Sequence, residues 1–206
     1  MKIYRVSTDD DCQILVNDER SPAKKDIVYS LGIGKKFNGK WVTPKLRIYN
    51  PLEKKPNFYY FASGSFVVDE KTCDIFQSIF EMAGELLPVN CTDFKGYLLN
   101  ITQCVNCLDH DFCEYEKDSD TGEDLYLKKV VFQKSMIPES TLFKIPEDNG
   151  VDIFTTEGMG IREEFKEMYE KHKMKGLKFE LIWSDEKLSR SLSKKISKPS
   201  KLKFGE

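Results

Sequence analysis

The stretch FVVDEKTCDIFQSIFEMAG, residues 66–84, predicts the central strand–helix unit of the fold. Residues 66–68 are apolar and suit a buried strand, and the carboxylate of Asp69 can accept the free backbone N–H groups of a helix start. The helix is expected over residues 70–83, because five side chains recur there at the spacing of one buried face: Cys73, Phe76, Ile79, Phe80 and Ala83. Gly84 is expected to end it as a left-handed residue.

A second strand–helix–strand unit is expected nearer the C-terminus. Residues 151–154 are apolar, and Thr155 or Thr156 can cap a helix over about residues 156–175. Apolar and aromatic side chains recur there at helical spacing: Ile161, Phe165, Met168, Tyr169 and His172. Gly176 would end that helix. The alternation that follows predicts a half-buried strand with four side chains on one face: Leu177, Phe179, Leu181 and Trp183.

The remaining extended segments are short and separated by turns. They lie at residues 2–6, 45–49, 57–61, 86–89, 97–102, 125–133 and 141–145, the first of them resembling an edge strand. Short strands in this arrangement indicate a mostly antiparallel sheet. The predicted fold class is therefore α+β, with two principal helices at about 70–83 and 156–175.

Composition limits the class of protein. The chain has 206 residues, of which 40% are hydrophobic and 12% aromatic, so it can bury a core and is not a disordered chain. The 32 basic residues nearly balance the 34 acidic ones, so no overall field favours nucleic acid or a membrane surface. The beginning of the chain has no signal-peptide pattern, and no run approaches the roughly 20 apolar residues of a membrane span. We therefore expect a cytoplasmic protein with reduced cysteines.

Charge and composition suggest three regions. Residues 1–84 form an N-terminal lobe, residues 85–184 a C-terminal α+β region, and residues 185–206 a flexible basic tail with seven Lys or Arg against three acids. A basic tail can bind nucleic acid, which gives one alternative function. The simpler interpretation is a solubilising terminus.

One segment has metal-ligand residue types: Cys104, Cys107, His110 and Cys113. Thiolates and imidazole are the ligands that zinc prefers, so a small zinc protein is a second alternative. Three-residue spacing on a strand, however, sends successive side chains to opposite faces. Buried free thiols are therefore the favoured interpretation, with no metal or cofactor. With two histidines and no nucleophile-elbow, zinc-protease or phosphate-loop motif, the sequence does not indicate an enzyme.

The densest negative charge lies at residues 109–124, where eight acids accompany the single Lys117. We expect an exposed hairpin loop whose charge would attract a basic partner. The predicted partner-binding residues are Asp118, Asp120, Glu123 and Asp124. A further candidate contact is the aromatic run that contains Phe58, Tyr59 and Tyr60.

Several short sequence motifs resemble those of a bacterial protein family. They are ELLP at 85–88, GYLLN at 96–100, CLD at 107–109, EYE at 114–116, LFKIPE at 142–147 and GLKFELIW at 176–183. In this order they resemble the immunity proteins of polymorphic toxin systems, a family related to a myxobacterial domain formerly of unknown function. The resemblance covers residues 65–184 and leaves the first 60 residues unmatched.

The resemblance implies a binding function without catalytic residues. Members of that family neutralise a cognate protein toxin, generally in the cytoplasm of the producing cell. For this chain it implies occlusion of a toxin surface. From the balanced charge and the lack of a long apolar run, we expect no membrane or nucleic-acid partner.

Overall fold

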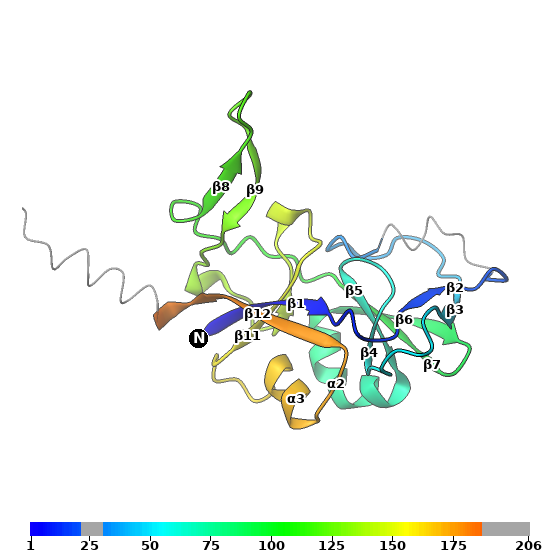
Figure 1. Cartoon of the computed structure of the whole chain (residues 1–206). Coiled ribbons are helices and arrows are strands. Elements are labelled where there is room, and N and C mark those ends of the chain that lie inside the picture. Colours follow the sequence, from blue (N-terminus) through cyan, green and yellow to red (C-terminus); the bar gives the residue numbers. More distant parts are fainter. Residues whose placement is uncertain (22–30, 187–206) are drawn as a thin grey trace, which may run out of the picture.

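The computed structural model describes residues 1–21 and 31–186 (Figure 1). Two α-helices lie in this part of the chain, α2 (Glu70–Ala83) and α3 (Phe165–Lys171), with short 3-10 turns η1 (Lys134–Met136) and η2 (Pro146–Asp148). The strands are β1 (Lys2–Thr8), β2 (Leu15–Asn17), β3 (Lys45–Ile48), β4 (Phe58–Tyr60), β5 (Ser65–Asp69), β6 (Gly84–Cys91), β7 (Lys95–Ile101), β8 (Glu114–Lys117), β9 (Asp124–Lys129), β10 (Leu142–Phe143), β11 (Ile153–Glu157) and β12 (Leu177–Ser184).

The strands form two main sheets and a separate hairpin. One sheet has the order β10-β11-β1-β12, the other β2-β3-β6-β7-β5-β4, and β8 and β9 pair only with each other. Every strand pair is antiparallel in the described residues except β3 with β6. The predicted α+β fold class is therefore confirmed. None of the helices in the described ranges is long and apolar enough to cross a membrane.

The predicted helix over residues 70–83 is confirmed. Asp69 caps it, because its Oδ1 accepts a hydrogen bond from the backbone N–H of Thr72 at 2.8 Å. Gly84, however, is extended, with φ 172°, and begins β6 directly, so the predicted left-handed stop is wrong. Glycine is needed there because a Cβ atom would lie 2.0 Å from the carbonyl oxygen of Asn100 on β7.

The second helix is shorter than the sequence pattern predicts. It covers only residues 165–171, and Thr155 and Thr156 lie inside β11 rather than at a helix start. Pairing explains this difference, because β11 lies between β1 and β10 and is hydrogen-bonded to both. The loop between β11 and α3 is held by the buried side chain of Glu164. Its carboxylate accepts hydrogen bonds from the backbone N–H groups of residues 158, 159 and 160.

The predicted single face of the last strand is also wrong. β12 pairs with β1, and the register shifts by one residue where Ile3 faces Trp183 and Tyr4 faces Leu181. This bulge sends Trp183 to the face opposite Leu177 and Phe179. β1 itself is paired on both sides, with β11 and β12, so it is not the predicted edge strand.

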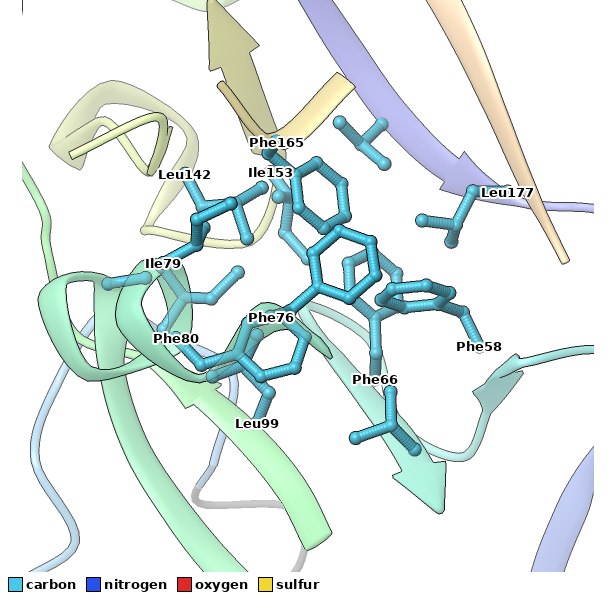
Figure 2. Close-up of a cluster of buried hydrophobic side chains, with 14 of the residues drawn as sticks. Phe58, Phe66, Phe76, Ile79, Phe80, Leu99, Leu142, Ile153, Phe165 and Leu177 are labelled. Carbon is cyan, nitrogen blue, oxygen red and sulfur yellow. The ribbon is translucent and has the colours of Figure 1, made fainter. Parts of the chain in front are cut away.

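The main hydrophobic core lies where the two sheets meet the helices. Figure 2 shows its aromatic centre, in which rings from β4, β5, α2 and α3 pack together. We call this cluster the central core; its aromatic members are Phe58, Phe66, Phe76, Phe80, Phe165 and Tyr169. A second cluster, the hairpin-side core, covers the other face of the four-stranded sheet with Ile3, Cys107, Leu108, Val131, Phe132, Phe143, Ile145, Phe154 and Trp183.

The two main sheets mix the predicted lobes. β1 lies among strands from the C-terminal part, while β7, from beyond residue 84, lies between β5 and β6. The predicted boundary between two lobes at residue 84 therefore stays a prediction. The predicted basic tail falls mostly on residues 187–206, outside the described residues.

A buried lysine joins three loops. Lys144 is 0% exposed, and its Nζ donates to the carbonyl oxygens of Gly32 at 2.5 Å and of Gly64 and Gly150 at 2.7 Å. Burial lowers the pKa of Lys144 to about 8, so the side chain remains mainly charged at pH 7. We call this arrangement the lysine clamp.

Glu157 on β11 is expected to make acid stability pH-dependent. Burial alone would raise its pKa, but hydrogen bonds from Tyr4, Lys166 and Lys2 lower it to about 2. A carboxyl with a lowered folded-state pKa stabilises the fold above its unfolded pKa of about 4.5, and that contribution is lost as the pH falls toward 2. We expect Glu157→Gln to reduce the free energy of unfolding at pH 7 by roughly 1–2 kcal/mol and to flatten its decline below pH 4.5.

Urea titrations at several pH values between 2 and 7 check this expectation. Glu53→Gln, at an exposed position, is the control and should follow the wild-type curve. Parallel curves for the wild type and Glu157→Gln would contradict the assigned role of Glu157.

Candidate functional site

The β8–β9 hairpin projects away from the two main sheets (Figure 1). Two cross-strand ion pairs support it, Lys128 with Glu116 at 3.0 Å and Lys129 with Glu114 at 2.8 Å. These pairs neutralise the charges along its length. The other acidic residues of the hairpin lie at its end, the place that the sequence predicted for the exposed acidic loop.

At this end, which we call the acidic tip (residues 118–124), one carboxylate has a structural role. The Oδ1 of Asp118 accepts N–H bonds from Asp120 at 2.9 Å and Thr121 at 2.8 Å, and these bonds, Thr121 first, lower the pKa of Asp118. The side chains of Asp120 and Glu123 are exposed. For Asp124 the structure describes the backbone, which pairs with Lys117. The predicted acidic residues are therefore brought together in one loop, with Asp118 shaping it.

Large apolar side chains are exposed just below the acidic tip. Leu125 is 58% and Tyr126 62% exposed on β9. Phe112 is exposed at the other end of the hairpin, in the loop before β8. Apolar side chains of this size on a projecting element are typical of protein contact sites. They were not among the predicted contact residues, although the apolar run LYL at 125–127, directly after the acidic loop, was a visible signal.

A groove of about 470 Å³ lies between the hairpin and the turn η2. Its lining comes from β9, β1 and the segment 145–154: Arg5, Leu125, Tyr126, Leu127, Val130, Ile145, Glu147, Asp148, Asn149, Asp152 and Phe154. We call it the hairpin groove. Its apolar wall comes from the hairpin and its carboxylates from η2 and the residues that follow.

The carboxylates of the hairpin groove differ in their partners. Asp152 lies 2.9 Å from the guanidinium of Arg5, whereas Asp148 accepts backbone N–H bonds, among them those of Val151 at 3.2 Å and Asp152 at 3.0 Å. Burial, and then the nearby Asp152 carboxylate, raise the pKa of Asp148. Glu147 has His110 3.3 Å from its Oε1, while its Oε2 is buried without a hydrogen-bond partner.

The aromatic run requires a correction. Phe58 and Tyr59 are each 1% exposed, so a partner cannot contact them in this fold. Strand β4 is buried on both faces, and alternation sends Phe58 into the central core and Tyr59 into the core behind the six-stranded sheet. Tyr60 is partly exposed at the end of this strand.

The four zinc-type residues do not share one environment. Cys107 is buried, which raises its pKa to about 12, while Cys104 is exposed and Cys113 partly buried. Within residues 1–21 and 31–186 there is no group of three or more His, Cys, Asp or Glu side chains placed to hold a metal ion. The expectation that all these thiols are buried is therefore wrong for Cys104.

Comparison with known proteins adds no relative. No protein-family model matches the chain, and a search of curated proteins finds no match. The resemblance to toxin-neutralising immunity proteins therefore stays a prediction that rests on the sequence words quoted above.

Proposed function

We propose that this chain is an immunity protein that binds a cognate bacterial toxin and neutralises it by occlusion, with the β8–β9 hairpin as its contact element. The observation that carries the proposal is the projecting hairpin, which combines an acidic tip with exposed Leu125 and Tyr126. Binding by occlusion needs a contact area of roughly 800 Å² per partner and aromatic anchors rather than a reactive group. A projecting hairpin with a groove at its base suits that requirement.

The charge of the acidic tip favours a toxin with a basic active cleft. A nuclease has such a cleft, because contacts with phosphates dominate its affinity for nucleic acid. Exposed charges act mainly on the rate of association, and salt screens them over about 8 Å at physiological ionic strength. The acidic tip would therefore guide the encounter, and the apolar side chains below it would hold the complex.

The test needs a candidate toxin domain, and a gene directly upstream that encodes a large secreted protein with a variable C-terminal domain would supply it. Reversing Asp120 and Glu123 to lysine is expected to slow association with that domain about tenfold at low salt, because both side chains are exposed. The carboxylate of Asp120 accepts a hydrogen bond from the hydroxyl of the adjacent Ser119 at 3.2 Å, which does not link it to the rest of the loop. Dissociation should change little, and the effect should shrink at 0.5 M salt. Asp118 is left unchanged because its carboxylate holds the loop.

The matched control reverses two exposed acids elsewhere, Glu53 and Asp93, and should leave the association rate close to wild type. An unchanged association rate for the Asp120 and Glu123 variant at all salt concentrations would exclude the acidic tip from the mechanism. Failure of the wild-type protein to bind or inhibit the neighbouring toxin would contradict the proposed function itself.

A further inference from the structure

The hairpin groove holds more negative than positive charge. Of the four ionised side chains that line it, Glu147, Asp148 and Asp152 are acids and only Arg5 is a base. Arg5 is engaged by Asp152 at 2.9 Å and by Glu180, outside the groove lining, at 3.6 Å. No cation of the described chain therefore neutralises both Glu147 and Asp148.

The neighbouring basic groups make no direct contact with Asp148 in the described part of the chain. Lys144 lies next to η2 and attracts Asp148 electrostatically, but its Nζ donates its hydrogen bonds to three backbone carbonyls. The Nε2 of His110 lies 3.3 Å from the Oε1 of Glu147, and the imidazole carries a charge only when it is protonated. The Nδ1 of His110 lies 2.9 Å from the hydroxyl of Tyr115. Among residues 1–21 and 31–186, no group makes a hydrogen bond with the buried Oε2 of Glu147, which is costly for a carboxylate.

The opposite wall of the groove is apolar and aromatic. Leu125, Tyr126 and Leu127 form it from β9, and the volume of about 470 Å³ exceeds the lower end, about 300 Å³, of ordinary ligand sites. A planar cation fits such a site better than an ammonium. A guanidinium presents a fork of donors to carboxylates and stacks on an aromatic face, whereas lysine offers a compact, strongly hydrated charge.

We propose that the hairpin groove receives an arginine side chain of the protein partner, with its guanidinium between Glu147 and Asp148 and against the ring of Tyr126. The inference rests on the proposed function for the identity of that partner, the toxin. The acidic tip then acts at a distance on the encounter, and the groove provides the short-range anchor. An arginine held in this way would contribute mainly to the lifetime of the complex.

The first experiment uses a small probe and does not need the toxin. N-acetyl-arginine amide is titrated into the full chain while backbone amide signals are followed by NMR, with N-acetyl-citrulline amide as its neutral isostere. We expect saturable shifts, in the millimolar range, at residues 125–127 and 147–152 for the arginine compound only. Asp148→Asn and Tyr126→Ala should each weaken this binding at least fivefold, and the exposed control Asp93→Asn should not.

Two outcomes would overturn the inference. Equal shifts with the citrulline compound would show that the charge is irrelevant, and shifts spread over all exposed acids would show non-specific pairing. Thermal melting of each variant establishes that it is folded. Tyr126→Ala keeps the test decisive if Asp148→Asn unfolds, because Tyr126 is largely exposed and its replacement should leave the fold intact.

The second experiment separates this inference from the proposed function. With the toxin domain, Tyr126→Ala and Asp148→Asn should raise the dissociation constant at least tenfold, mainly through faster dissociation. Toxin binding that is unchanged in both variants would refute the groove while the proposed function stands. Specific binding of the arginine probe without any toxin binding would refute the proposed function while the groove stands.

Discussion

Replacement of Lys144 by methionine is expected to lower the free energy of unfolding by roughly 3–5 kcal/mol. The side chain is fully buried, and its ammonium is the hydrogen-bond donor for three backbone carbonyls. Methionine fills similar space without a donor, so Gly32, Gly64 and Gly150 would each keep a carbonyl without this partner. A buried polar group left unsatisfied costs about 1–3 kcal/mol.

The lysine clamp also explains why glycines stand at its loops. Gly64 has φ +71°, and a Cβ atom there would lie 2.5 Å from the Nζ of Lys144. A Cβ atom on Gly32 would lie 2.1 Å from the carbonyl oxygen of Ser63. The loops therefore approach the ammonium closely only because they lack side chains at these points. The clamp ties β10 to loops from the N-terminal half of the chain.

Urea unfolding of Lys144→Met at pH 7 checks the expected loss. Lys40→Met removes a lysine from an exposed position and should change the free energy of unfolding by less than about 0.5 kcal/mol. A loss of the same small size for Lys144→Met would mean that the three hydrogen bonds contribute little. A changed slope with urea in the variant would indicate local opening of the clamped loops.

The sequence could not predict the lysine clamp. Alternation places Lys144 on the same side as Leu142, but β10 is buried on both faces, with Leu142 in the central core and Phe143 in the hairpin-side core. The acceptors lie at residues 32, 64 and 150, in loops that no local pattern connects. A lysine inside the apolar word LFKI was the only local signal that this charge needs a partner.

Local signals explain which elements were predicted correctly. The helix over residues 70–83 depends on a cap, a periodic face and a nearby strand, all within twenty residues, and its bounds agree with the structure. β11 and β12 are strands as predicted, but the helix start at Thr155 or Thr156 and the single face of residues 177–183 were wrong. Both details depend on pairing with β1, more than 140 residues away in sequence. No pattern in the neighbouring sequence indicates the bulge beside Trp183 or the strand conformation of Thr155.

In the candidate site, too, the feature with a local sequence signal was predicted and the feature that depends on distant residues was not. The acidic tip was predicted from composition, because a run of charges with few apolar residues is solvated in almost any fold. The hairpin groove was not predicted, because it forms only when β9 lies beside η2, some twenty residues later in the chain. The aromatic run was offered as a candidate contact, although a continuous apolar run also fits a strand with two buried faces.

Phe58→Ala is therefore expected to destabilise the fold rather than to remove a binding contact. The ring of Phe58 lies at the middle of the central core, with five other aromatic rings at centroid distances of 5.5–6.3 Å (Figure 2). Removal of a buried phenylalanine costs about 3–5 kcal/mol, because both the transfer energy and the contacts of its neighbours are lost. Phe58→Leu retains most of the volume and should cost clearly less.

Stability and binding measured on the same variants distinguish the core from the contact surface. Under conditions where Phe58→Ala remains folded, its affinity for the toxin domain should equal that of the wild type, because the side chain is 1% exposed. Tyr126→Ala should behave in the opposite way, with nearly unchanged stability and weakened binding, because its ring is mostly exposed at the hairpin groove. Weakened binding by folded Phe58→Ala, together with wild-type stability, would return the aromatic run to the contact surface. That result would also mean that β4 leaves the central core when the partner binds.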